Sequence, residues 1–164
     1  YGPIAKLKRI GKNNKEIFVR KLRTMHPFSE YIQEYIFDKN NLKEGGKIKN
    51  DFRVTPEGKF LRKFWIDELP MIYNILRGDI KLVGVRPLSP HFLSLYPKEL
   101  QKLRSKFKPG FIPPYYVDLP STLDEIIKSE IKYLKLCEKN EFRTDLKYFF
   151  LAFKNVLFKG ARSN

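Results

Sequence analysis

The stretch KFWIDELPMIYNILRGDIKLVGVRP, residues 63–87, holds most of the signals that decide the fold of this chain. It predicts a short helix and then a buried strand. Asp67 suits the N-cap of the helix, Pro70 falls within the first turn, where proline is tolerated, and Gly78 suits the C-terminal stop. Residues 79–85 follow as a short apolar run of strand length. The carboxylates of Asp67 and Glu68 are therefore predicted at a helix N-terminus.

Working outward, the N-terminal residues predict a β-hairpin. Apolar and basic side chains alternate over residues 3–10 and 15–20, with Gly-Lys-Asn-Asn between them, which is the pattern of two strands with one solvated face. A short helix is predicted over residues 27–39 and an exposed polar loop over residues 40–51.

Downstream of the central stretch, helices dominate. Residues 89–107 predict one broken or two short helices, and residues 122–139 and 143–160 predict two amphipathic ones. The segment KPGFIPPYYVDLP, residues 108–120, is so rich in proline that a shaped loop without regular structure is expected. The fold class that follows is mixed α/β (α+β), with a small β-sheet or hairpin and several helices.

The last helix allows two interpretations. A stripe of large apolar side chains recurs at helical spacing, at Leu146, Phe149, Phe150, Phe153 and Leu157, and lysines border it. Such a helix can pack against a core. It can also lie in a membrane interface, with its aromatic side chains in the acyl boundary and its lysines at anionic headgroups.

The composition narrows the class of partner. The chain has 164 residues, of which 42% are hydrophobic, enough to build the core of a single domain. Its net charge of +15 predicts a partner rich in negative charge: nucleic acid, an anionic membrane surface or a phosphorylated substrate. The single cysteine, Cys137, excludes an intrachain disulfide and favours a reducing, intracellular setting.

The Asp67–Glu68 pair is the strongest candidate for chemistry. Helix capping and a favourable helix dipole explain such a pair without any catalysis. Cations, however, stand near it in the sequence or at the ends of the predicted elements: Lys21, Arg23, Arg62, Lys63 and Arg86. Carboxylates surrounded by fixed cations suit phosphoryl chemistry, because cations bind phosphates while a carboxylate attacks or holds a divalent ion. The isolated histidines His26 and His91 offer little material for a zinc site or a histidine-based triad.

At this point the sequence resembles a known family. The run RVTPEGKFLRKFWIDELPMIYNILRGDIKLVGVRP, residues 53–87, is similar to the signature of the bacterial sugar transferases, the monotopic phosphoglycosyl transferases. Residues 2–25 resemble the entry segment of the same family. The resemblance implies transfer of a sugar-1-phosphate from a nucleotide diphosphate-sugar, usually a UDP-sugar, to polyprenol phosphate, with release of UMP and with Mg²⁺ as cofactor.

The resemblance also assigns roles to residues. In the family the Asp of the dyad is the nucleophile that forms a covalent phosphosugar intermediate, and the adjacent Glu helps to hold magnesium. These roles fall on Asp67 and Glu68, both placed at the metal. The basic positions that match the family's phosphate-binding set are Lys21, Arg23, Arg62 and Arg86, with Arg9 as a weaker match.

A cellular setting is implied as well. The resemblance places a single catalytic domain, residues 1–164, at an anionic membrane surface on the cytoplasmic face of the bacterial inner membrane. There it would start a surface polysaccharide or glycoconjugate, such as an exopolysaccharide or lipopolysaccharide. The membrane-embedded helical hairpin that precedes this domain in the family is not expected within these residues, and no nucleic-acid partner is expected. The sugar, the polyprenol and the oligomeric state stay open.

The sequence departs from the family pattern at several positions. Trp65 stands where the family usually has a small hydroxyl residue, Met71 where it often has Gln, and Val85 where it has proline. Residues 108–120 keep Lys-Pro-Gly but lack the usual glycine-containing continuation. These changes bear on specificity and not on the dyad. They leave one alternative open, a catalytically inactive peripheral membrane or scaffold protein of the same fold. A nucleic-acid-binding module, suggested by charge alone, is a second alternative.

Overall fold

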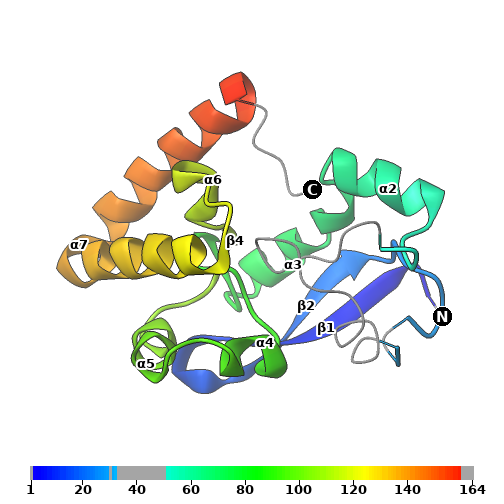
Figure 1. Cartoon of the computed structure of the whole chain (residues 1–164), viewed down its shortest axis with the longest axis horizontal. Coiled ribbons are helices and arrows are strands. Elements are labelled where there is room, and N and C mark those ends of the chain that lie inside the picture. Colours follow the sequence, from blue (N-terminus) through cyan, green and yellow to red (C-terminus); the bar gives the residue numbers. More distant parts are fainter. Residues whose placement is uncertain (1, 30, 33–50, 160–164) are drawn as a thin grey trace.

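An antiparallel hairpin forms one side of the molecule (Figure 1). The computed structural model describes residues 2–29, 31–32 and 51–159. In it β1 (Ile4–Ile10) pairs with β2 (Glu16–Leu22), with Ile4 opposite Leu22, and a 3-10 turn, η1 (Lys12–Asn14), joins them. The predicted hairpin is confirmed. Of the helix predicted over 27–39, residues 27–29 and 31–32 are described; they form turns, with a left-handed φ of 65° at Phe28. The other residues of that helix, and the loop predicted over 40–51 except Asp51, lie outside the described residues.

Helix α2 (Pro56–Lys63) packs on the end of the hairpin and was not predicted. Its start has the usual signals: Thr55 is the N-cap, its Oγ1 accepts a hydrogen bond from Gly58 N at 3.0 Å, and Pro56 follows at the first position. Gly58 lies directly against Thr24, since a Cβ at Gly58 would stand 2.1 Å from the Thr24 carbonyl oxygen. This close approach fixes α2 over the end of β2.

The dyad does not cap a helix, so that prediction is wrong. Asp67 lies inside a separate 3-10 turn, η2 (Ile66–Glu68), while helix α3 (Met71–Leu76) begins after Pro70. The physical reason is the backbone conformation of Trp65. Its φ of 59° lies in the left-handed region, so the chain leaves the α2 helix there and Asp67 falls in the separate turn η2. Gly78, with a φ of 73°, follows the C-cap of α3 as predicted.

Asn74 joins α3 to the hairpin by hydrogen bonds. Its side chain is fully buried; Nδ2 donates to Phe18 O at 2.8 Å and Oδ1 accepts from Arg20 N at 3.0 Å. Beneath it, the buried side chains Ile17, Val19, Met71 and Ile80 form a small core cluster. The helix that follows the dyad is therefore anchored to β2.

Residues 108–120 are regular in structure, contrary to expectation. They contain β4 (Gly110–Ile112), which pairs in parallel with β3 (Lys81–Val83), and a short helix, α6 (Tyr115–Asp118). The strand predicted over 79–85 is confirmed in its centre. The two strands approach very closely, because a Cβ on Gly110 would stand 2.0 Å from Gly84 N. This pairing brings α6 beside the segment that follows β3.

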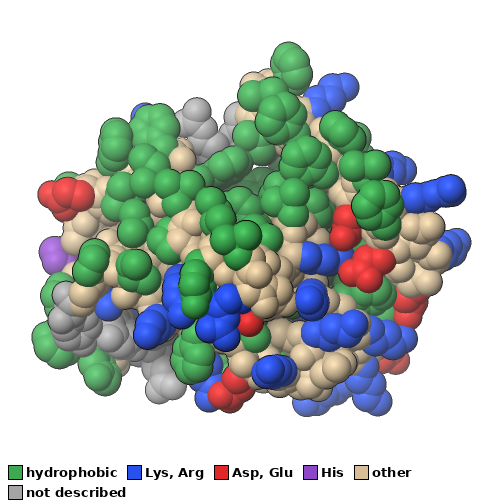
Figure 2. All heavy atoms as spheres, turned by 180° about the vertical axis from the view of Figure 1, so that it is seen from behind, with side chains coloured by type: hydrophobic (Ala, Val, Ile, Leu, Met, Phe, Trp, Pro, Cys, Tyr) green, Lys and Arg blue, Asp and Glu red, His purple; other side chains and the backbone are tan. Residues whose placement is uncertain are grey.

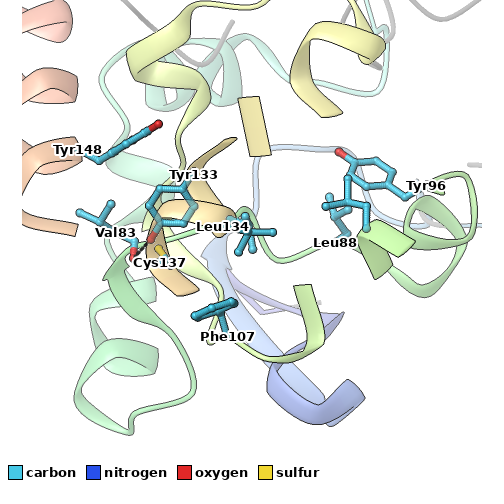
Figure 3. Close-up of a cluster of buried hydrophobic side chains, with 10 residues drawn as sticks. Val83, Leu88, Tyr96, Phe107, Tyr133, Leu134, Cys137 and Tyr148 are labelled. Atoms are coloured by element: carbon cyan, nitrogen blue, oxygen red, sulfur yellow. Dashed lines mark hydrogen bonds between the residues drawn. The ribbon is translucent and has the colours of Figure 1, made fainter. Parts of the chain in front are cut away.

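The large core lies where α7 (Leu123–Lys159) crosses β3 and the helices α4 (Pro90–Ser94) and α5 (Lys98–Ser105). The two short helices predicted over 89–107 are confirmed. Figure 3 shows the core side chains, with Tyr133 and Leu134 fully buried in it. The Tyr133 hydroxyl donates a hydrogen bond to Asp145 Oδ1 at 2.5 Å. Burial in the same core raises the pKa of the Cys137 thiol to about 11, so the thiol stays neutral.

Helix α7 consists of two segments, as predicted. The backbone breaks at Asn140, whose Oδ1 accepts from Arg143 N at 2.9 Å and so caps the second segment. Tyr148 and Ala152 of that segment are buried, whereas Phe150 and Phe153 are 61% and 56% exposed. The face that packs inside is therefore not the aromatic stripe, most of which stays exposed. Within the described part of the chain, no helix has the length and apolarity to cross a membrane. The α+β fold class is confirmed.

Candidate active site

The two carboxylates of the dyad lie between β2 and α2. Asp67 is buried in η2, at 7% exposure, and the Glu68 Oε1 atom forms an ion pair with Lys21 Nζ, which β2 delivers. Burial raises the pKa of Asp67 above its ordinary value, and the negative charge of Glu68 adds to this effect. Lys21 and Arg62 act in the opposite direction, since each favours the ionised carboxylate. The local structure thus places the buried carboxylate of Asp67 near two cations, Lys21 and Arg62.

Further cations converge on the same place from separate elements. Arg62, from α2, donates through Nε to Thr24 Oγ1 at 2.9 Å; burial lowers its pKa while Asp67 raises it. Arg9, from β1, has its pKa lowered to about 10 by burial and by the positive charge of Arg86. Burial is the larger cause that lowers the pKa of Lys21, and the positive charge of Arg86 lowers it further. Such mutual effects require these groups to be close together.

Arg23 is placed differently from the other candidates. Its backbone N donates to Pro3 O at 2.7 Å and its Nε donates to Gly2 O at 3.1 Å, at the open end of the hairpin. The structure brings Lys21, Arg62 and Arg86 to the dyad, and Arg9 lies near Arg86.

Arg86 is held both by its backbone and by its side chain. Its carbonyl oxygen accepts from Arg104 Nη2 at 2.5 Å, and Arg104 forms a buried ion pair with Glu130 of α7. Its guanidinium Nη1 donates to the Tyr115 hydroxyl at 3.3 Å. Its pKa is raised, first by Tyr115 and then, against the effect of burial, by Glu68. The arginine after β3 is thus tied to α5, α6 and α7.

Three aromatic side chains, Trp65, Tyr115 and Tyr116, pack side by side next to the dyad; we call them the aromatic wall. The ring centroids of Tyr115 and Tyr116 are 4.6 Å apart, and those of Trp65 and Tyr116 are 5.4 Å apart. Trp65 Nε1 is buried and has no hydrogen-bond partner within the described part of the chain. Asn155 of α7 holds α6 in place, donating to Tyr116 O at 3.0 Å and to Val117 O at 2.9 Å.

The family follows from comparison with known proteins. The family model described as bacterial sugar transferase matches residues 2–159. The chain belongs to the bacterial sugar transferase family. This confirms the family predicted from residues 53–87.

Relatives of this chain come from several bacteria. It is 35% identical over 155 residues to the galactosyl transferase CpsE of Streptococcus agalactiae, covering 91% of this chain and 33% of the relative. It is 34% identical over 93 residues to the undecaprenyl-phosphate galactose phosphotransferase of Salmonella typhimurium, covering 54% and 20% of the two chains. A UDP-N-acetylgalactosamine-undecaprenyl-phosphate N-acetylgalactosaminephosphotransferase of Aeromonas hydrophila is 35% identical over 102 residues, covering 60% and 21%. The chain thus spans a third or less of the length of these relatives.

Sequence reasoning found the charged residues of the site but missed those that support them. Tyr115, Tyr116 and Arg104 received no role, and the only signal for the tyrosines was their adjacency in the atypical segment 108–120. In the folded chain, Tyr116 of this segment packs against Trp65, so two departures from the family pattern lie in contact beside the dyad.

The donor set of the dyad fits a magnesium ion held together with substrate. Within the described residues of the chain there is no group of three or more His, Cys, Asp or Glu side chains that could hold a metal alone. Magnesium, however, is commonly bound by one or two carboxylates, with substrate phosphates and water completing the octahedron. Asp67 and Glu68 supply two carboxylates, and Glu68 would exchange its ion pair with Lys21 for the metal.

Proposed function

We propose that this chain transfers a sugar-1-phosphate from a UDP-sugar to a polyprenol phosphate through a covalent intermediate on Asp67. The observation that carries the proposal is the convergence of Lys21, Arg62 and Arg86 on the carboxylates of buried Asp67 and adjacent Glu68, with Arg9 near Arg86. Both substrates and the nucleophile are anionic, so they come together only where fixed positive charge offsets their repulsion.

In the first step, an oxygen of Asp67 attacks the phosphorus that carries the sugar. The bond from that phosphorus to the oxygen bridging the two phosphates breaks, and its electron pair leaves with UMP. The carboxylate attacks in its ionised form, so no general base is needed. Lys21 and Arg86 hold the diphosphate oxygens during the attack, and Arg62 favours the ionised form of Asp67.

In the second step, a phosphate oxygen of the polyprenol phosphate attacks the same phosphorus. The acyl phosphate bond to Asp67 breaks, the carboxylate is restored, and the product is a polyprenyl diphosphate-sugar. When bound at Asp67 and Glu68, magnesium supplies positive charge that neutralises the diphosphate. Division into two steps lets one site serve two bulky substrates in turn.

The substrates proposed first are UDP-hexoses. Relatives of the chain carry names that refer to galactose and to N-acetylgalactosamine phosphotransfer onto undecaprenyl phosphate. A product of this kind would start an exopolysaccharide or another surface glycoconjugate. Because the lipid acceptor resides in the membrane, the site would work at the cytoplasmic surface of the inner membrane.

The exposed hydrophobic surface supports this location. Large side chains are exposed on α2 and α3 (Phe60, Phe64, Ile72 and Leu76) and on the second segment of α7 (Phe150, Phe153, Leu157 and Phe158). Figure 2 shows hydrophobic side chains gathered over these elements on one face, with Lys and Arg side chains below them. Exposed hydrophobic side chains gathered on one face mark interaction or membrane surfaces, and adjacent basic residues suit anionic headgroups.

The reaction is tested by measuring intact-protein mass after incubation with Mg²⁺ and UDP-galactose or UDP-N-acetylgalactosamine. The parent should gain the mass of the sugar phosphate and release UMP, while Asp67→Asn should gain nothing. Equal modification of both proteins would place the nucleophile elsewhere. Absence of both adduct and UMP from a folded parent, also after addition of polyprenol phosphate in lipid, would favour the inactive scaffold.

The membrane surface is tested by co-sedimentation with vesicles of phosphatidylglycerol and phosphatidylethanolamine. Phe153→Ser should reduce the bound fraction several-fold, because it removes a large side chain that is 56% exposed on α7. Leu95→Ser is the matched control, since Leu95 is also exposed, at 43%, but follows α4 at the opposite end of the molecule in Figure 1. Equal losses in the two variants would contradict the assigned face.

A further inference from the structure

Arg86 lies among charges of both signs. Its positive charge lowers the pKa of Arg9, Lys21 and Arg62, so three groups of its own sign lie close to it, while the negative charge of Glu68 raises the pKa of Arg86 itself. Charge alone leaves the flexible side chain of an arginine free to turn between such neighbours and solvent. A contact on the guanidinium is needed to hold it in one orientation.

The contact comes from Tyr115. The hydroxyl oxygen accepts a hydrogen bond from Arg86 Nη1 at 3.3 Å, and a hydroxyl acceptor holds a cation without neutralising it. A carboxylate in the same place would satisfy Arg86 fully and compete with phosphate. A neutral acceptor leaves the positive charge available to a ligand.

Tyr115 is itself fixed from several sides. Its ring packs on Tyr116 at 4.6 Å, and the Tyr116 ring packs on Trp65 at 5.4 Å. The pKa of Tyr116 is raised by burial and also by its interaction with the Tyr115 hydroxyl. The two hydrogen bonds from Asn155 hold the backbone of Tyr116 and Val117. The aromatic wall therefore forms a rigid support between α7 and the dyad.

We propose that Tyr115 is a positioning residue that holds the Arg86 guanidinium toward the dyad against the repulsion of Arg9, Lys21 and Arg62, ready for the diphosphate of the substrate. The inference rests on the proposed function for the identity of that diphosphate. Preorganisation of this kind improves binding because the ligand need not order the arginine itself.

The role has a clear consequence for binding. Tyr115→Phe keeps the ring and its packing on Tyr116 but removes the acceptor. The backbone of Arg86 stays fixed by Arg104, so only the guanidinium becomes free to turn. Hydrogen bonds to charged groups are the stronger ones in proteins, and we expect affinity for a nucleoside diphosphate to fall about fivefold to tenfold.

The test is calorimetric titration of UDP, with Mg²⁺ present, into the folded parent and four variants. These are Tyr115→Phe, Arg86→Ala, the double variant, and Tyr148→Phe as a matched control that removes a tyrosine hydroxyl in the large core. Tyr115→Phe should weaken UDP binding, and Tyr148→Phe should not. In the Arg86→Ala background Tyr115→Phe should cause no further loss, because the residue acts through Arg86.

Unchanged UDP affinity in Tyr115→Phe would overturn the proposal, and so would a full additional loss in the Arg86→Ala background. The intact-mass experiment separates this result from the proposed reaction. Weaker UDP binding in Tyr115→Phe without any sugar-phosphate adduct on the parent would uphold the positioning role and refute the transfer. An adduct on the parent with unchanged UDP affinity in Tyr115→Phe would uphold the transfer and refute the positioning role. A parent that neither binds UDP nor forms an adduct would refute both the transfer and the positioning role.

Discussion

Substitution of Gly110 by alanine should disrupt the parallel pairing that places α6 beside Arg86. The new Cβ would stand 2.0 Å from Gly84 N and 2.4 Å from Gly84 Cα, where ordinary van der Waals contacts begin at 3.4 Å. Both atoms belong to the backbone, so no side chain can move aside, and the strands must separate by more than an ångström. Three backbone hydrogen bonds depend on this approach: Lys81 N to Pro109 O, Gly110 N to Val85 O, and Gly84 N to Ile112 O.

Each of these hydrogen bonds contributes about 1 kcal/mol, so their loss should lower the free energy of unfolding by about 3 kcal/mol. For a chain of this size the melting temperature should fall by roughly 6–12 °C. Urea unfolding followed by far-UV circular dichroism measures the change. Gly2→Ala is the matched control, because a Cβ there meets nothing within 4 Å. If Gly110→Ala and Gly2→Ala unfold at the same urea concentration, the close approach of β3 and β4 is refuted.

Three further predictions concern the charged groups. Burial raises the pKa of Asp67 and Lys21 lowers it, so Lys21→Met should move the acidic limb of the transfer rate to higher pH; an unmoved limb would show that Lys21 does not act on the Asp67 carboxyl. A raised pKa means that folded Asp67 binds its proton more tightly than the unfolded chain does, which costs stability above the unfolded pKa. Asp67→Asn should therefore be more stable than the parent to urea at pH 7, with the difference vanishing at acidic pH, and lower stability at pH 7 would contradict the sign. Glu130→Gln should cost about 3–5 kcal/mol in urea unfolding because it leaves Arg104 buried without its anionic partner, whereas Glu138→Gln at an exposed pair should cost less than about 1 kcal/mol; similar costs would refute the buried pair.

The sequence predicted the elements whose signals are local. The alternation of the hairpin, the glycine stop at Gly78 and the two segments of α7 all depend on neighbouring residues and are confirmed. Helix α2 was missed although Thr55 and Pro56 mark its start, because the glycine and lysines inside it weaken the apolar periodicity.

Other parts were not readable from local signals. The position of Asp67 depends on the left-handed backbone of Trp65, a conformation that a large aromatic residue seldom adopts and that no pattern announces. Residues 110–112 become a strand only because residues 81–83 lie beside them, which is a pairing between distant parts of the chain. Proline-rich composition alone therefore indicated a loop.

The same contrast holds for the site. The family signature supplied the charged candidates, of which Lys21, Arg62 and Arg86 lie at the dyad in the folded chain. The aromatic wall could not be predicted, since Trp65 and Tyr116 are brought together by the β3–β4 pairing and by the hold of α7 on α6. Charged side chains can be recognised in the sequence, but the aromatic side chains that support them come together only through packing of distant segments.

The position of Trp65 has a practical consequence. It is the single tryptophan of the chain, and it stands two residues before Asp67 with its ring against Tyr116. Its indole emission therefore comes wholly from the neighbourhood of the dyad. Ligand arrival, movement of α6 or local opening of the site can be followed in the unlabelled protein as a change in intrinsic fluorescence, without a background signal from any other indole.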